Sequence, residues 1–160
     1  FVGDGSKWGL NISISEEERA LETAGGIKKA MKYLGDEAFA VINADIFSDY
    51  NYENLKARSL QNNIMGHLVL VNNPEHNLKG DFGIMDNGIL TMNFERSLTF
   101  SGIAIYDPKF FSELAEGNKI KLAPILEIAI NKKCIQGELF EGLWSDVGTP
   151  ERLNMINLNE

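Results

Sequence analysis

The chain has 160 residues, of which 44% are apolar and 24% charged, a balance typical of one globular domain. Its formal net charge of −8 argues against general nucleic-acid binding, which depends on a surplus of lysine and arginine. No apolar run approaches the ~18 residues of a membrane helix, and the amino terminus lacks a secretory signal pattern. We therefore expect a cytoplasmic protein with no membrane partner.

The first part of the chain predicts two helices around a buried strand. Residues 23–34 carry apolar side chains at helical spacing and end at Gly35-Asp36, a typical helix stop. The apolar run 39–43 is typical of a buried strand whose carboxyl end points at a site. A second helix is expected over 52–61.

The middle of the chain predicts strands. Residues 67–71 are continuously apolar after His67 and rich in β-branched or aliphatic side chains, which favours a strand inside a sheet. The Asn-Gly pair within 86–88 joins the runs 82–85 and 89–92 and predicts a hairpin, because a tight turn requires positive φ. A further strand is expected over 99–106.

The last part of the chain predicts three helices and one strand. Pro108 opens a helix expected to run to about residue 115, and 124–131 is expected to form a helix with an almost wholly apolar face. A late strand is expected over 138–144. Pro150 begins a closing helix, with Thr149 as its predicted cap.

The alternation of strands and helices, interrupted once by a hairpin, predicts the fold class. It indicates an α/β fold with a doubly wound, mainly parallel, Rossmann-like sheet and a small antiparallel hairpin. No linker or repeat divides the chain, so we expect residues 1–160 to form one domain. The glycine-rich phosphate loop of such a fold is not visible, because residues 3–6 lack a preceding strand and are interpreted as a turn.

Asp45 and Asp146 are the main candidates for chemistry, because each follows an apolar strand and faces a loop. Taken alone, a strand-end Asp is more often a turn or capping residue than a metal ligand. A hard dication that bridges phosphates, however, usually takes only one or two protein carboxylates, since water and substrate fill its other positions. The pair is therefore a candidate Mg²⁺ site.

Three segments of the chain form a set in this order: Leu21-Glu22-Thr23-Ala24-Gly25-Gly26-Ile27, Val41-Ile42-Asn43-Ala44-Asp45 and Trp144-Ser145-Asp146-Val147-Gly148-Thr149-Pro150-Glu151-Arg152-Leu153. Together they resemble segments of the sugar-1-phosphate nucleotidyltransferases, enzymes that join a nucleoside monophosphate to a sugar-1-phosphate and release pyrophosphate. In that family, the first segment lies under the nucleotide base, the second ends in a metal-binding Asp, and the third supplies the second metal ligand.

Within that family, residues 80–83 and 98–103, with the long form of the 22–27 loop, are most similar to the N-acetylmuramate-1-phosphate uridylyltransferases. Mannose-1-phosphate guanylyltransferases share much of the same pattern. The resemblance therefore implies a nucleoside triphosphate and a sugar-1-phosphate as partners and favours the uridylyl and N-acetylmuramate forms, while the base and the sugar stay open.

The resemblance also implies a role for each matching position. The expected catalytic and metal residues are Asp45 and Asp146; the nucleotide-binding residues are Glu22, Thr23, Ala24, Gly25, Gly26 and Asn43; and the residues for the sugar or its phosphate are Gly80, Asp81, Thr99 and Ser101.

Three further residues have two interpretations each. Lys121, just before a predicted helix, either meets a substrate phosphate or is a surface charge. His76 either edges the sugar pocket or is a solvated loop residue, and His67, which opens a strand, is expected to be structural rather than functional.

The chain departs from the family pattern in two places. Ala44 stands where the family usually has Gly, which restricts the backbone slightly. The family's amino-terminal strand, Gly-rich loop and basic stretch do not match anything in the 160 residues. We therefore expect the carboxy-terminal two thirds of an enzyme, weakly active by itself.

Two functions from other classes stay open. One is a catalytically silent regulatory domain of the same fold, which the unmatched phosphate loop favours and the two Asp residues disfavour. The other is a metal-dependent glycosyltransferase. Those enzymes usually carry an Asp-x-Asp pair, whereas Phe47 lies two residues after Asp45. The oligomeric state is not predicted.

Overall fold

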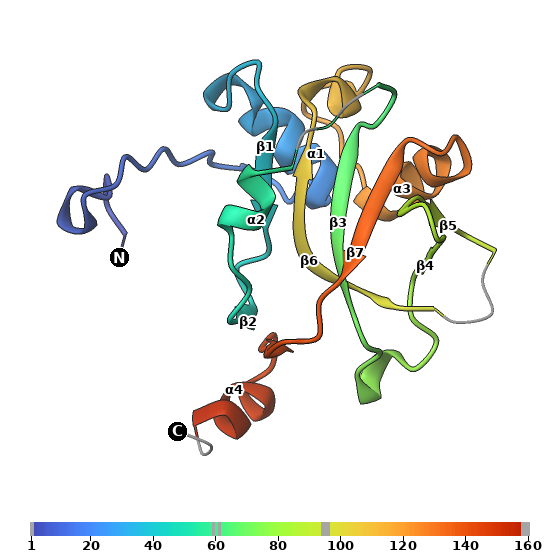
Figure 1. Ribbon diagram of the computed structural model, residues 1–160. Helices are drawn as coiled ribbons and strands as arrows, with labels where there is room; N and C mark the ends of the chain where they lie inside the picture. The colour runs from blue at the N-terminus through green and yellow to red at the C-terminus, as the bar shows by residue number, and fades with distance from the viewer. Residues whose placement is uncertain (1, 59, 61, 94–96, 158–160) are drawn as a thin grey trace.

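A computed structural model describes residues 2–58, 60, 62–93 and 97–157, and only the backbone of Met155. Its centre is a four-stranded sheet in the order β1-β6-β3-β7 (Figure 1). The strands are β1 (Phe39–Ile42), β6 (Thr99–Tyr106), β3 (Gly66–Val71) and β7 (Ile135–Leu139). β7 pairs parallel with β3, and β6 pairs antiparallel with both β1 and β3. Three of the four strands therefore share one direction, and β6 runs against them.

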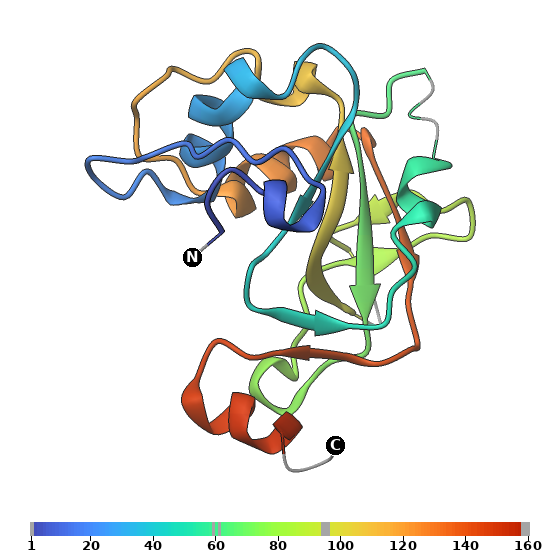
Figure 2. The same cartoon turned by 90° about the vertical axis from the view of Figure 1, so that its left-hand side faces the viewer.

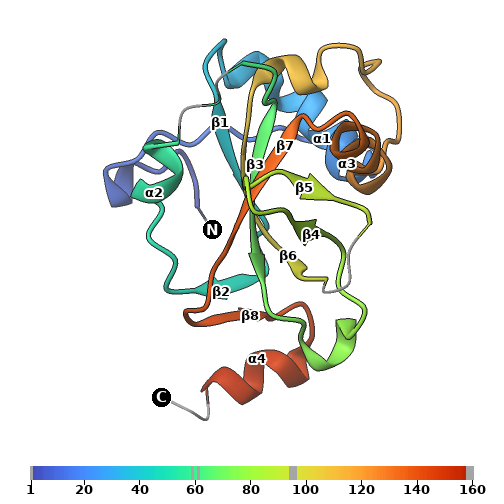
Figure 3. The same ribbon diagram turned by 45° about the vertical axis from the view of Figure 1, so that its right-hand side comes forward.

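Two helices cover one face of this sheet. α1 (Glu22–Ala30), extended by a 3-10 turn η2 (Met31–Tyr33), and α3 (Leu122–Asn131) lie on the same side in Figure 3. Their apolar faces pack on alternate residues of the strands, including Leu68 and Leu70 of β3. Burial of this apolar surface is the main force that holds the helices to the sheet.

The other face carries a smaller apolar cluster. Leu55, on the short helix α2 (Glu53–Lys56), and Tyr50 pack on Val69 and Ile103 of the sheet. The buried His67 of β3 lies beside Glu138 of β7 on this face, with its Nε2 3.5 Å from Glu138 Oε1. This buried position favours a structural role for His67, which stays a prediction.

Two small two-stranded units complete the fold. The predicted hairpin is confirmed: β4 (Gly83–Ile84) pairs with β5 (Leu90–Thr91), and Gly88 in its turn has φ +79°. β2 (Ile46–Ser48) pairs antiparallel with β8 (Trp144–Asp146), below the central sheet in Figure 3. α4 (Pro150–Asn157) follows β8 (Figure 2). Three 3-10 turns remain, η1 (Ser6–Trp8), η3 (Glu75–Asn77) and η4 (Pro108–Phe111).

The α/β class is confirmed, but several boundaries differ from the sequence-based expectation. The helix expected over 52–61 is only α2, followed by a turn, and residues 59 and 61 lie outside the described ranges. The helix expected over 108–115 is the 3-10 turn η4, in which Phe110 and Phe111 are both buried.

The largest difference concerns the expected late strand over 138–144. It is divided between β7 and β8, because the chain leaves the central sheet once the Phe140 N–H has bonded Leu70 O at 2.8 Å. The following residues then pair with β2 instead. In the described ranges, none of the helices has the length and apolarity that crossing a bilayer requires.

Candidate active site

Asp45 and Asp146 are brought together by the pairing of β2 with β8. Ile46 lies opposite Asp146 in this ladder, and Val147 N donates a 2.8 Å hydrogen bond to Asp45 O. The two predicted strand ends, far apart in the sequence, are therefore neighbours in the fold.

The two carboxylates face one point beside Gly148. A Cβ added to Gly148 would lie 3.1 Å from Asp45 Oδ2 and 3.3 Å from Asp146 Oδ1. The glycine therefore leaves a small space between two carboxylate oxygens, the donor type that Mg²⁺ prefers. In the described part of the chain, no group of three or more His, Cys, Asp or Glu side chains is placed to hold a metal ion.

Asp146 already has a protein partner on each oxygen. His76 Nε2 lies 3.1 Å from Oδ2, and Arg152 Nη2 lies 2.7 Å from Oδ1. Arg152 is held at the start of α4, where its backbone N–H donates a 3.3 Å hydrogen bond to Thr149 Oγ1. This bond confirms Thr149 as the predicted cap.

A cavity of about 460 Å³ opens beside the two carboxylates. It gathers side chains from β2, β8, β6 and the loop that contains η3. The residues lining it are Asn43, Asp45, Ile46, His76, Asn77, Asp81, Thr99, Phe100, Ser101, Gly102, Trp144 and Asp146.

An irregularity in β6 shapes this cavity. The register between β3 and β6 shifts at Val69/Leu70, so that Ser101 and Gly102 bulge out of the ladder. Gly102 has φ +79°, and a Cβ there would lie 2.8 Å from Asn43 Nδ2. The bulge also accepts a 2.9 Å hydrogen bond from Trp144 Nε1 at Ser101 O. It therefore positions both Asn43 and Trp144 at the cavity.

The hydroxyls of the two predicted sugar contacts on β6 are bonded within the protein. The fully buried Ser101 donates to Val69 O at 2.7 Å and accepts from Ile103 N at 3.1 Å. Thr99 Oγ1 donates to Asn73 Oδ1 at 2.9 Å. Both residues line the cavity, but these hydroxyls also stabilise its wall, and their contact with a sugar stays a prediction.

Asp81 ties the loop after β3 to the bulged strand. Its Oδ2 accepts a 2.8 Å hydrogen bond from Phe100 N, and its Oδ1 accepts one of 3.2 Å from Asn77 Nδ2. Gly80 before it has φ +62°, and a Cβ there would lie 2.6 Å from Asn73 Oδ1. Only glycine fits this position without strain.

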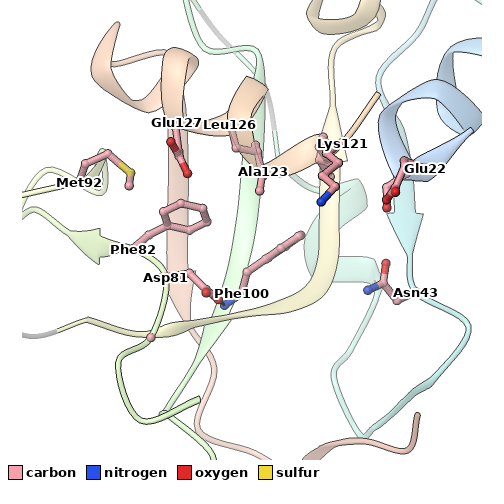
Figure 4. A pocket seen from close by; sticks show the side chains of 13 residues that line it. Glu22, Asn43, Asp81, Phe82, Met92, Phe100, Lys121, Ala123, Leu126 and Glu127 are labelled. Carbon is pink, nitrogen blue, oxygen red and sulfur yellow. Dashed lines mark hydrogen bonds between the residues drawn. The ribbon is translucent and has the colours of Figure 1, made fainter. Parts of the chain in front are cut away.

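A second cavity, of about 590 Å³, adjoins the first and shares Asn43, Asp81 and Phe100 with it (Figure 4). In Figure 4 the Lys121 ammonium points into the space between Glu22 and Phe100. The residues lining this cavity are Glu22, Thr23, Asn43, Gly80, Asp81, Phe82, Met92, Phe100, Lys121, Leu122, Ala123, Leu126 and Glu127.

The predicted nucleotide loop divides into two parts. Glu22 and Thr23 line the second cavity, and Glu22 has φ +60°, an uncommon conformation for a residue with a side chain. The buried Ala24 and Gly25 instead use their N–H groups to bond Ile120 O, each at 3.1 Å. Gly26 approaches Glu17, with its would-be Cβ 2.6 Å from Glu17 Oε1. These last three residues line neither cavity, and their contact with a nucleotide stays a prediction.

Several side chains at the site carry no role in the sequence-based prediction. Trp144 and Arg152 lie inside a matching motif but had no assigned role, and Glu127 faces the second cavity from α3. The Asn73 and Asn77 amides brace Thr99. The local sequence signal for Asn73 and Asn77 was the group of asparagines around Pro74.

Residues 1–160 match the model of the nucleotidyl transferase family, and the chain belongs to this family. It is 41% identical over 157 residues to the N-acetylmuramate alpha-1-phosphate uridylyltransferase of Neisseria meningitidis serogroup B, covering 95% of this chain and 68% of that relative. It is 26% identical over 161 residues to the mannose-1-phosphate guanyltransferase of Gibberella zeae, covering 91% of this chain and 43% of that relative. The resemblance to sugar-1-phosphate nucleotidyltransferases is confirmed.

The solved structures agree on the fold. A crystal structure of a candidate glucose-1-phosphate thymidylyltransferase from Bacillus anthracis, in complex with sucrose, aligns with a TM-score of 0.74. The alignment covers 99% of this chain and 69% of that one, at 19% identity. The chain thus spans about two thirds of that structure and of the Neisseria meningitidis relative, and less than half of the fungal enzyme.

Proposed function

We propose that the protein transfers a nucleoside monophosphate from a nucleoside triphosphate to a sugar-1-phosphate and releases pyrophosphate. The convergence of Asp45 and Asp146 beside Gly148, next to the two joined cavities, is the observation that carries this proposal. A site for two phosphorylated substrates needs both a place for a hard cation and adjoining space for two ligands, and this region offers both.

In this proposal Asp45 and Asp146 hold Mg²⁺, because their oxygens are the hard donors that this ion takes and Gly148 leaves the space between them open. When bound, Mg²⁺ would neutralise part of the phosphate charge that keeps two anionic substrates apart. The remaining work of the protein is to bind and orient.

The reaction needs no covalent enzyme intermediate. A phosphate oxygen of the sugar-1-phosphate attacks the α-phosphorus of the triphosphate, and the bond from that phosphorus to the pyrophosphate oxygen breaks. Asn43 and Asp81, which line both cavities, would stand where the two substrates meet. Lys121, which has no ion-pair partner among the described residues, would compensate a substrate phosphate.

UTP and N-acetylmuramate-1-phosphate are the favoured substrates, because the 41% identical relative bears that name. This assignment would place the enzyme in the cytoplasm, in peptidoglycan recycling. Mannose-1-phosphate with GTP, or another sugar-1-phosphate pair, is the alternative that the more distant guanyltransferases support. The paired carboxylates argue against a silent domain, and the family match argues against a glycosyltransferase.

The test measures pyrophosphate release by the full gene product that carries this chain, across a panel of triphosphates and sugar-1-phosphates. Asp45→Asn and Asp146→Asn should each lower kcat by at least about a hundredfold, since a metal-bound charge is lost at the reacting phosphates. Asp36→Asn is the matched control, because Asp36 is an exposed Asp outside both cavities. Full activity of Asp146→Asn at saturating Mg²⁺ would show that the proposed site is wrong.

A further inference from the structure

The two side chains that contact Asp146 contact different oxygens. Arg152 Nη2 contacts Oδ1 at 2.7 Å, and His76 Nε2 contacts Oδ2 at 3.1 Å. Oδ1 is the oxygen beside the point that Asp146 shares with Asp45, because it lies 3.3 Å from the would-be Cβ of Gly148. Arg152 therefore contacts the oxygen that faces the shared point, and His76 contacts the other one.

Arg152 also approaches that shared point directly. Its Nη2 lies 3.4 Å from the would-be Cβ of Gly148, so one cationic nitrogen and two carboxylate oxygens surround the same small space. A guanidinium and a dication so close together repel each other. Arg152 Nε is buried with no hydrogen-bond partner among the described residues, so the guanidinium satisfies only part of its hydrogen-bonding capacity in this position.

His76 has the opposite relation to the site. A side chain that contacts the outer oxygen of a metal-binding carboxylate orients that carboxylate and can stay in place when the inner oxygen binds a metal. His76 reaches Asp146 from η3, a segment separate from α4, which carries Arg152. It can thus keep Asp146 aimed at Asp45 after Arg152 has moved away.

We propose that Arg152 and His76 set the metal affinity of the site in opposite directions. Arg152 competes with the cation for Asp146 Oδ1, and His76 is a positioning residue that holds Asp146 through Oδ2. The proposal rests on the assignment of Asp45 and Asp146 as metal ligands. It adds that cation binding requires the Arg152 side chain, at the start of α4, to release its carboxylate.

The experiment is a titration of the full protein with Mn²⁺, with the free ion followed by electron paramagnetic resonance at one fixed pH. Arg152→Gln should bind Mn²⁺ about threefold more tightly, the scale of a partly exposed ion pair. His76→Ala should bind it about tenfold more weakly, the scale of losing a residue that orients a ligand. His76→Gln, which still presents an N–H donor, should recover most of the wild-type affinity.

Arg19→Gln is the matched control for the loss of one positive charge. Arg19 bonds Gly117 O at 3.1 Å and lines a cavity that shares no residue with the site. Its Mn²⁺ affinity should equal that of the wild type. If Arg152→Gln binds no more tightly than Arg19→Gln, or if the Arg152 and His76 variants shift in the same direction, the proposal is overturned.

Asp146→Asn separates this proposal from the one on which it rests. If Asp146→Asn loses Mn²⁺ binding but the two opposite shifts are missing, only the roles of Arg152 and His76 are wrong. If Asp146→Asn binds Mn²⁺ as well as the wild type, the metal assignment fails, and the roles of Arg152 and His76 fail with it.

Discussion

Glu138 should make the stability of the fold depend on pH in a defined range. Its carboxylate lies on the face of the sheet away from α1 and α3, where three side chains meet it. His67 Nε2 is 3.5 Å from Oε1, the Tyr50 hydroxyl donates to Oε1 at 2.6 Å, and the Arg58 guanidinium pairs with Oε2. The contact with His67, followed by those with Tyr50 and Arg58, lowers the pKa of Glu138 from 4.5 to about 2 against the opposing effect of burial.

The size of the effect follows from this pKa difference. At about 1.4 kcal/mol per pKa unit, a shift from 4.5 to about 2 corresponds to roughly 3 kcal/mol of folding free energy. Because the pKa is lowered in the folded state, this stability is present above pH 4.5 and is lost as the pH falls toward 2. By pH 3.5, roughly 1.4 kcal/mol of it should already be gone.

The measurement is urea unfolding of the wild type and Glu138→Gln between pH 7 and pH 2.5. The wild type should lose its advantage over the variant progressively below pH 4.5, whereas other carboxylates affect both proteins alike. The Tyr50 phenol, whose pKa is raised by burial and then by its bond to Glu138, stays neutral throughout and contributes no slope. A free-energy difference between the two proteins that is independent of pH over this range would refute the reasoning.

Two further predictions concern the cavities. Gly102→Ala and Gly88→Ala should each lower the unfolding free energy by about 1–2 kcal/mol, because both glycines have φ +79°. Only Gly102→Ala should also lower kcat. Its added Cβ would push against Asn43, whereas no atom lies within 4 Å of a Cβ added at Gly88. Equal kcat values for both variants would show that the bulge does not position Asn43. Lys121→Gln should raise the KM of one phosphorylated substrate by about tenfold, the scale of one charged hydrogen bond, with little effect on kcat. Lys132→Gln, at the other end of α3, is the control for Lys121→Gln. If the two variants had the same KM, this result would count against a contact between Lys121 and a substrate phosphate.

The order of the main elements could be predicted from the sequence because their local patterns are strong. Each of these patterns can be recognised within a short stretch of sequence. The examples are the Asn-Gly turn of the hairpin, the apolar run of β3 and the helical spacing of the apolar residues in α3. The split between β7 and β8 could not be predicted in this way. It depends on β2, which residues 46–48 form only because β8 pairs with them across the fold.

The candidate site was predictable only in part, for the same reason. Asp45 and Asp146 could be found as strand ends, and their proximity follows from strand pairing. The contact of Asp146 with His76 joins two segments far apart in the sequence, so no local pattern indicates it. Arg152 lies in the same motif as Asp146, but the motif does not show that the two side chains meet. Conversely, the motif that contains Ala24 predicts a nucleotide contact, while the fold buries Ala24 in the core, because a motif does not show which of its residues face inward.

The most direct test of the metal-centred account is anomalous diffraction from a crystal of the protein soaked with Mn²⁺ and a nucleoside diphosphate sugar. The account predicts one strong anomalous peak between Asp45 and Asp146, within about 2.0–2.4 Å of an oxygen of each carboxylate. The claim would be contradicted if the nucleotide sugar bound but the anomalous peak lay elsewhere. It would also be contradicted if the side chains of Asp45 and Asp146 did not contact the ion.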